Sequence, residues 1–262
     1  DGDSAEWTAE DGGWEDGRGS LSMKYDEKFL YFYAQWEGFD PERDTLYIPI
    51  DTTPKTGSTY CQNYDITFER PCDFLIRVHG ENDSRVMVQE RYEVLKAVYW
   101  ESYYIVDPYV SPPDKRSPLF VNIDLALRLA DLVPKSEMDQ RVGEAVETGL
   151  LRWGNANPDS GDFDSLADFM FTENGVEIRL PWQLLNFSNP SEMMIHDDYY
   201  ENYGVENLHI DEMYVGLTDG RSDTRTHMAP LALEGWGKTV TYHERLKKSY
   251  YMLQEYWAER DN

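Results

Sequence analysis

The chain has 262 residues, and its 50 Asp and Glu against 24 Lys and Arg give a formal net charge of −26 at neutral pH. This charge repels phosphate backbones and anionic membrane surfaces, which argues against nucleic acid; it favours neutral or cationic ligands and Ca²⁺, although a solubilising surface is its simplest explanation. No apolar run approaches the ~20 residues that cross a bilayer, so no membrane insertion is expected.

A β-hairpin is the first regular element that the sequence predicts. Residues 20–37 place apolar side chains at alternate positions, Leu21 and Met23 before Leu30 and Phe32, with polar residues 26–28 between the two runs. A period of two puts one face of each strand in the core, and the polar break marks the turn. The same alternation predicts further strands at residues 44–51, 73–80, 84–94, 175–182, 213–220 and 237–244.

Helices are expected at three places. Residues 121–133 have one apolar face and end before Pro134, and residues 181–187 begin with a proline suited to a first helical turn. The tail at 244–262 has apolar side chains at helical spacing that would dock it against the rest of the domain: Leu246, Tyr250, Leu253 and Trp257.

The stretch 95–170 lacks a regular apolar pattern. It holds the proline-rich "DPYVSPPDKRSP" and the polar run "GNANPDSGDFDS", which are typical of loops. We interpret it as a long elaboration of one core. The sequence therefore predicts an all-β, antiparallel β-sandwich that forms a single domain over residues 1–262, with residues 95–170 inserted and a C-terminal helix packed against it.

The two cysteines leave two interpretations open. Cys61 and Cys72 lie eleven positions apart in "CQNYDITFERPC", a spacing that fits a disulfide closing a short loop or hairpin. Buried free thiols are the alternative.

A set of segments in fixed order resembles a known family. The segments are "DGDSAEW", "LSMKYDEKFLYFYAQWEG", "ERDTLYIPIDTTPKTGS", "FLIRVHG", "ENGVEIRLPWQLL" and "YVGLTDG". Together they resemble the family 9 carbohydrate-binding modules and the wider DOMON-like sandwiches. The resemblance implies that "DGDSAEW" is the first strand, with Trp7 buried in the core and its carboxylates at the rim.

The resemblance also implies a function. We expect a non-catalytic carbohydrate-binding module that takes a polysaccharide or oligosaccharide, within a larger multidomain polysaccharide-processing protein that is secreted or attached to the cell surface. Glu42 and Arg77 stand where the family has a polar ligand-binding pair, and the alternative is that they pair with each other as a strut. Tryptophans would supply stacking surfaces in place of those of the family, and the candidates are Trp153, Trp100 and Trp236.

Two other functions stay open. With no G-x-S-x-G, Walker, H-E-x-x-H or G-x-G-x-x-G motif, no catalytic residue is nominated and a non-catalytic role is favoured. The alternative is an uncharacterised, glycoside hydrolase-like enzyme whose insertion builds a cleft. A haem-binding DOMON-like domain is a weaker alternative, because methionines in strands usually fill the core, and no organic cofactor is expected. Its axial ligands would come from Met193, Met194, His196, Met213 and Met228.

A calcium site is a further hypothesis. Five side chains with oxygen donors lie within ten residues: Asn155, Asn157, Asp159, Asp162 and Asp164. Their spacing lacks the glycine and the final glutamate of an EF-hand loop. A turn held by hydrogen bonds from Asn and Asp side chains is the alternative.

Overall fold

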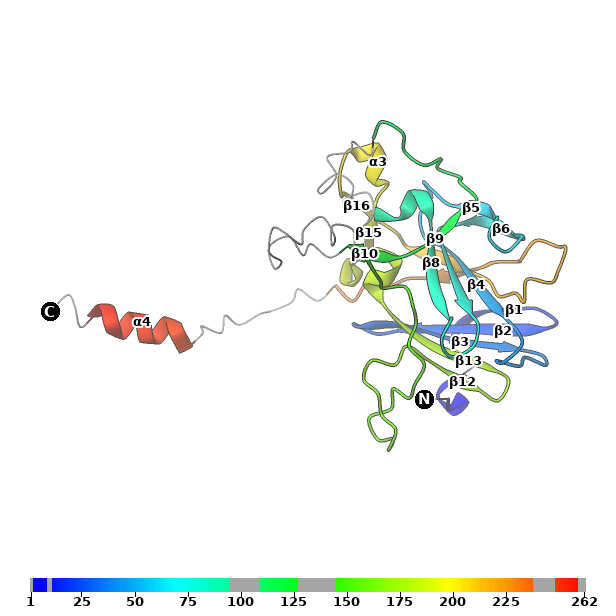
Figure 1. Ribbon diagram of the computed structural model, residues 1–262, viewed down its shortest axis with the longest axis horizontal. Coiled ribbons are helices and arrows are strands. Elements are labelled where there is room, and N and C mark those ends of the chain that lie inside the picture. The colour runs from blue at the N-terminus through cyan, green and yellow to red at the C-terminus, as the bar shows by residue number, and fades with distance from the viewer. Residues whose placement is uncertain (1, 9–10, 95–108, 127–144, 238–247, 259–262) are drawn as a thin grey trace, which may run out of the picture.

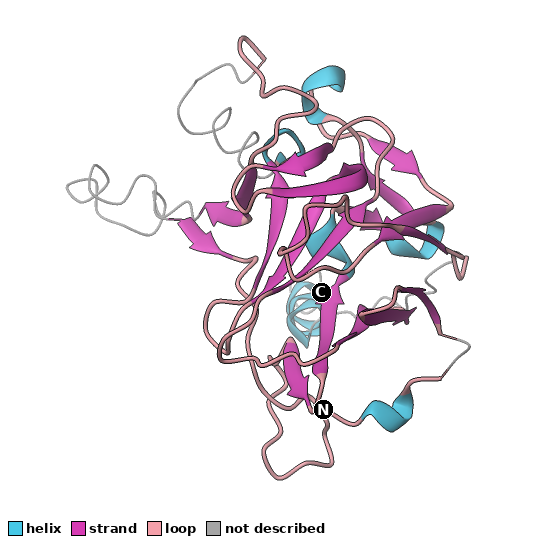
Figure 2. Ribbon diagram, turned by 90° about the vertical axis from the view of Figure 1, so that its right-hand side faces the viewer, coloured by secondary structure: helices cyan, strands magenta, loops and turns pink. Residues whose placement is uncertain are grey.

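The computed structural model describes residues 2–8, 11–94, 109–126, 145–237 and 248–258. Two antiparallel sheets lie face to face and dominate this part of the chain, as Figures 1 and 2 show. The predicted all-β sandwich is confirmed.

The first sheet, here sheet A, has five strands in the order β1-β2-β3-β13-β12. Their bounds are Gly12–Glu15 (β1), Gly19–Tyr25 (β2), Phe29–Trp36 (β3), Gly175–Pro181 (β13) and Phe169–Thr172 (β12). The strands β2 and β3 form the predicted hairpin, and Leu21, Met23, Leu30 and Phe32 are all buried. The central pair β3–β13 joins segments that are far apart in the sequence.

The second sheet, here sheet B, has six strands in the order β18-β17-β4-β7-β8-β9. Their bounds are Ala229–Ala232 (β18), Glu212–Val215 (β17), Leu46–Asp51 (β4), Phe74–Val78 (β7), Arg85–Gln89 (β8) and Phe120–Asn122 (β9). One buried cluster joins the inner faces of both sheets and includes Phe32, Ile48, Phe74 and Ile178. The stretch 95–170 supplies β9 to the edge of this sheet.

Smaller elements surround the sandwich. The hairpin of β5 and β6 packs on the outer face of sheet B, where Ile66 and Phe68 share a buried cluster with Leu75. The remaining strands are β5 (Ser58–Cys61), β6 (Ile66–Cys72), β10 (Asp124–Ala126), β11 (Ala145–Glu147), β14 (Phe187–Asn189), β15 (Met194–His196) and β16 (Asn207–His209). The helices are η1 (Ser4–Glu6), η2 (Glu90–Tyr92), η3 (Trp182–Leu185), η4 (Pro190–Glu192), α3 (Tyr199–Asn202) and α4 (Lys248–Ala258), the η elements being 3-10 turns. Within the described ranges no helix is long and apolar enough to cross a membrane.

Two local predictions of secondary structure are wrong. The segment "DGDSAEW" begins with the 3-10 turn η1, capped by the Asp3 carboxylate, and the first strand starts only at Gly12. The helix predicted at 121–133 is replaced over residues 121–126 by β9 and β10, because β9 pairs with the edge of β8 and β10 pairs with β11. The later residues of the predicted helix lie outside the described ranges.

The C-terminal helix forms, but its predicted docking is wrong. Tyr250, Leu253 and Trp257 are 49%, 49% and 61% exposed, and Figure 1 shows α4 apart from the two sheets. Leu246, the fourth residue expected to dock, lies outside the described residues, as do residues 238–244 of the last predicted strand.

Both cysteines are buried free thiols on the paired strands β5 and β6. Burial raises the pKa of Cys61 to about 11, and it also raises the pKa of Cys72 well above the usual value of a thiol. Cys72 contacts the sulfur of Met228 at 3.5 Å, so this side chain fills the space under the hairpin.

A buried carboxylate holds the turn after β4. Asp73 is fully buried and accepts hydrogen bonds from the N–H groups of Thr52 and Thr53 at 2.8 and 2.9 Å and from the hydroxyl of Thr56 at 2.8 Å. Burial and the nearby Asp51 raise the pKa of Asp73 to about 7. Burial also raises the pKa of Asp51 to about 6, although Arg70 bonds that carboxylate.

These two carboxyl groups predict a pH-dependent stability. Their raised pKa values mean that the native state binds protons more tightly than the unfolded chain, so their contribution favours folding below about pH 4 and is lost as the pH rises towards about 7. We expect the urea midpoint to be higher near pH 5 than near pH 8. Replacing Asp51→Asn removes one of the coupled charges and reduces this difference. Urea unfolding of the wild type, of Asp51→Asn and of the exposed control Asp223→Asn at both pH values tests this prediction. If the difference in midpoint between the two pH values is the same in Asp51→Asn as in Asp223→Asn, the prediction is contradicted.

Candidate functional site

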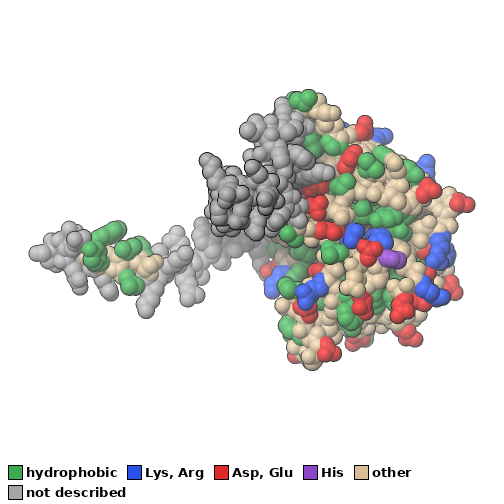
Figure 3. All heavy atoms as spheres, in the orientation of Figure 1, with side chains coloured by type: hydrophobic (Ala, Val, Ile, Leu, Met, Phe, Trp, Pro, Cys, Tyr) green, Lys and Arg blue, Asp and Glu red, His purple; other side chains and the backbone are tan. Residues whose placement is uncertain are grey.

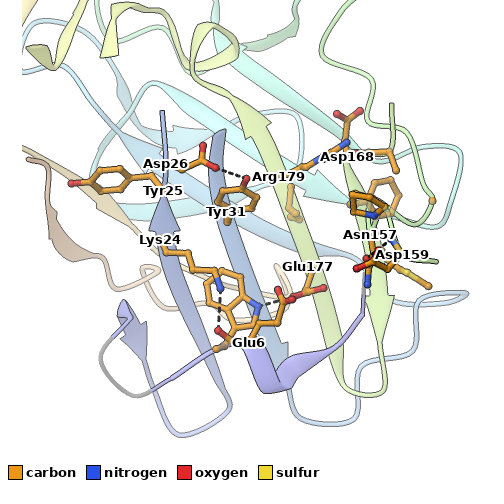
Figure 4. A pocket seen from close by; sticks show the side chains of 18 residues that line it. Glu6, Lys24, Tyr25, Asp26, Tyr31, Asn157, Asp159, Asp168, Glu177 and Arg179 are labelled. Carbon is orange, nitrogen blue, oxygen red and sulfur yellow. Dashed lines mark hydrogen bonds between the residues drawn. The ribbon is translucent and has the colours of Figure 1, made fainter. Parts of the chain in front are cut away.

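A cavity of about 620 Å³ opens on the outer face of sheet A. Its floor comes from β2, β3 and β13, one wall from the N-terminal segment around η1, and the opposite wall from the loop at 154–168 (Figure 4). Aromatic, acidic and basic side chains all line it, among them Trp7, Lys24, Tyr31, Asp168, Glu177 and Arg179.

The floor follows from strand alternation. Leu30 and Phe32 are fully buried on the inner face of β3, so Tyr31 between them points outwards. The same alternation on β13 sends Glu177 and Arg179 outwards. Tyr31 lies opposite Lys24 of β2 on one side and Arg179 of β13 on the other, which places an aromatic ring between two cations.

The N-terminal wall is held by a glutamate of β13. Glu177 accepts hydrogen bonds from the indole N–H of Trp7 at 2.6 Å and from the N–H of Gly2 at 2.7 Å. The Trp7 ring stacks on Tyr33 with the ring centroids 5.6 Å apart. The ammonium group of Lys24 lies 4.2 Å from the centre of the Trp7 ring and donates to the carbonyl of Glu6. Trp7 is therefore part of a wall and half-buried, whereas the resemblance implied a core residue.

The opposite wall is held by an arginine of the same strand. The guanidinium of Arg179 donates from Nε to the carbonyl of Ala167 and from Nη2 to that of Ser165, both at 2.7 Å. Its Nη1 has no hydrogen-bond partner among the described residues. Burial raises the pKa of the neighbouring Asp168, which accepts from the N–H of Arg152.

The hydroxyl of Tyr31 is fixed by Asp26 at the turn of the hairpin. It donates to Oδ2 of Asp26 at 2.9 Å, while Oδ1 accepts from the N–H groups of Lys28 and Phe29. Burial would raise the pKa of Asp26, but these three donors outweigh it and hold the pKa below the usual value. Burial and the bond to Asp26 raise the pKa of Tyr31 to about 12, so Tyr31 stays a neutral ring.

The polar pair expected from the resemblance lies elsewhere. Arg77 is on the outer face of β7 in sheet B, and its Nη1 donates to the carboxylate and the carbonyl of Asp83 at 2.8 and 2.9 Å. Glu42 is exposed in the loop before β4, where its N–H donates to Asp40. Arg77 thus pairs with Asp83, neither forming the alternative strut with Glu42 nor lining the cavity.

The candidate tryptophans are also spread over the fold. Trp153 is 41% exposed and pairs by its backbone with Phe169, at the edge of sheet A next to the cavity wall. Trp236 is half-buried, with its ring 5.9 Å from that of Trp182. Trp100 lies outside the described residues. The structure therefore does not bring Trp153 and Trp236 together with Glu42 and Arg77 in one site.

The loop predicted to bind calcium forms part of the cavity wall. Two side-chain oxygens are used by its own backbone, because Asn155 accepts from the N–H of Asn157 and Asn157 accepts from that of Asp159. Asp164 accepts from Leu166 and forms an ion pair with Arg152. Among the described residues no group of three or more His, Cys, Asp or Glu is arranged to hold a metal, and the calcium site, which includes Asp162, stays a prediction.

The methionines considered for haem ligation are mostly in the core. Met193, Met213 and Met228 are buried, whereas Met194 and His196 are half-buried in β15. None of these residues lines the cavity.

Sequence reasoning did not identify the residues of the cavity other than Asn157 and Asp159. The predicted strands carry Tyr31, Glu177 and Arg179 at their outward-facing positions. An aromatic side chain at such a position, with charged residues on the neighbouring strands, was the signal that could have identified them. Trp7 gave no such signal, because its partner Glu177 is 170 positions away.

Comparisons with models of protein families, with curated proteins and with solved structures find no match for this chain.

The hydrogen bond from Trp7 to Glu177 gives a testable prediction. Replacing Trp7→Phe removes the indole donor, and Glu177→Ala removes the acceptor; each change should lower the free energy of unfolding by about 1–2 kcal/mol, since the bond involves a charged partner. Urea unfolding of both variants and of the double variant measures their coupling. We expect about 1 kcal/mol of coupling, and strictly additive losses would show that the bond does not hold this wall.

Proposed function

We infer that the protein binds carbohydrate without catalysing a reaction, and that the cavity on the outer face of sheet A is the binding site. Sugars offer C–H groups on one face and hydroxyl groups around the rim, so their sites combine an aromatic surface with charged or amide hydrogen-bonding groups. The cavity has this combination. Tyr31 is the ring on its floor, and carboxylates, an amide and two cations stand around it.

The arrangement of Tyr31 is the observation that carries this proposal. Its ring is half-buried on a regular strand, its hydroxyl is fixed by Asp26, and its neighbours Lys24 and Arg179 are each held by other contacts. A surface fixed in this way loses little conformational entropy when a ligand binds. The volume of about 620 Å³ is within the range of small-molecule sites and suits a short oligosaccharide segment.

The resemblance to family 9 modules supports the same function but a different site. It favours Glu42 and Arg77, whereas the cavity favours Tyr31 and its neighbours. A secreted or surface-attached parent protein with further domains remains part of the proposal on the strength of that resemblance.

The proposal predicts unequal effects of two matched tyrosines. Tyr31 and Tyr60 are both half-buried, and each donates to an aspartate five positions away, Asp26 or Asp65. A glycan array with the wild-type domain identifies a binding oligosaccharide, and calorimetry then gives its Kd. We expect Tyr31→Ala to weaken binding at least about tenfold, ~1.4 kcal/mol, because the stacking surface is lost. Tyr60→Ala and the ring-preserving Tyr31→Phe should bind within about twofold of wild type.

Other outcomes separate the alternatives. Unchanged affinity in folded Tyr31→Ala together with weakened affinity in Arg77→Ala would move the site to sheet B. Release of reducing sugar from the bound glycan, abolished by Asp168→Asn, would instead support a glycan-active enzyme. The absence of any glycan ligand across the array would contradict the proposed function.

A further inference from the structure

The charges around the cavity are unequal. Two cations, Lys24 and Arg179, stand against five carboxylates, which are Glu6, Asp26, Asp159, Asp168 and Glu177. The whole chain has a net charge of −26, and the face shown in Figure 3 carries acidic side chains interspersed with basic ones. A ligand that enters the cavity therefore meets a negative potential, which clefts of low dielectric strengthen.

Both cations are already engaged by the protein. Lys24 donates to the carbonyl of Glu6 at 3.1 Å and lies over the ring of Trp7. Arg179 uses Nε and one N–H of Nη2 on the carbonyls of Ala167 and Ser165. The Nε–Nη2 edge of the guanidinium, one of the two edges that can hold a ligand carboxylate through parallel donors, is therefore already occupied by the protein.

The carboxylates differ in their remaining capacity to accept hydrogen bonds. Asp26 and Glu177 accept from chain donors on both oxygens. The carboxylates of Glu6 and Asp159 accept no hydrogen bond from the described residues, and they come from the two opposite walls in Figure 4. Asp168 is half-buried, and within the described part of the chain its carboxylate accepts only from the N–H of Arg152, through Oδ2. Spare acceptors in a negative cavity match a ligand with charged donors.

We propose that the cavity selects a cationic saccharide, an oligosaccharide of amino sugars with free ammonium groups, over its acetylated and its acidic counterparts. This inference rests on the proposed function and specifies its ligand class. Sugar rings contact Tyr31 as any saccharide would, and the ammonium groups add charge-assisted hydrogen bonds to Glu6 and Asp159. Uronic acids are disfavoured by repulsion from the same carboxylates.

Three hexamers of equal length test the preference: glucosamine, N-acetylglucosamine and galacturonate. Calorimetry near pH 5.5 keeps the sugar amine protonated while ordinary carboxylates are ionised. We expect the glucosamine hexamer to bind about tenfold more tightly than the acetylated hexamer at low salt. The difference should fall to about twofold in 1 M NaCl, where the Debye length is about 3 Å. The galacturonate hexamer should bind most weakly.

A matched pair of variants separates the cavity from the general surface charge. Glu6→Gln with Asp159→Asn removes two charges at the cavity, and Glu81→Gln with Asp223→Asn removes two exposed charges that do not line it. We expect only the cavity variant to lose the preference for the glucosamine hexamer while still binding the acetylated one.

The possible results are distinguishable. Equal losses in both double variants would assign the preference to overall charge and overturn the inference. Tighter binding of the acetylated or the acidic hexamer than of the glucosamine hexamer would also overturn the inference, but it would still support the proposed carbohydrate binding. If no hexamer binds and the glycan array also finds no ligand, both this inference and the proposed carbohydrate binding fail.

Discussion

The pairing of β3 with β13 is the constraint on which the rest of the structure depends. Its inner positions are all buried, at 0–2% exposure: Leu30, Phe32, Ala34, Val176, Ile178 and Leu180. Because side chains alternate, burying these residues fixes Tyr31, Tyr33, Glu177 and Arg179 on the outer face. A slip of one position would send the charged residues into the core, so the register is strongly determined. The close approach of the two backbones at the start of β13 needs Gly175, since a Cβ there would collide with the carbonyl of Ala34.

The outer residues of this pair then organise both walls of the cavity. Glu177 holds the N-terminal segment through Trp7 and Gly2, and Arg179 holds the loop at 165–167 through two carbonyls. Each charged group thus replaces its water shell with fixed partners from the chain, which compensates for its partial burial. One strand therefore supplies part of the floor and the anchors of both walls, and the cavity is shaped before any ligand arrives. In the proposed function, the spare acceptors of Glu6 and Asp159 contact the ligand.

Local pattern was enough to predict the central strands of both sheets, but neither their edge strands nor the cavity. The hairpin at 20–37 follows from alternation between near neighbours, and its polar positions carry Lys24 and Tyr31. Trp7 depends on a partner 170 positions away, so no local rule could place it. Arg77 has the residue type of a ligand-binding arginine, yet Asp83, six positions on, binds it. Residues 121–126 have helical spacing as well, but pairing with β8 and with β11, which are distant in the sequence, makes them strands.

An NMR titration of the isotope-labelled domain with a binding oligosaccharide tests the central claim most directly. The indole N–H of Trp7, which donates to Glu177, and the backbone amides of Lys24, Tyr31 and Arg179 report on the cavity, while the amides of Arg77 and Tyr64 report on sheet B. If the cavity is the binding site, the largest shift changes occur in the first group and the second group stays unchanged. Changes confined to Arg77 and Tyr64, with the Trp7 indole unaffected at saturation, would contradict the account.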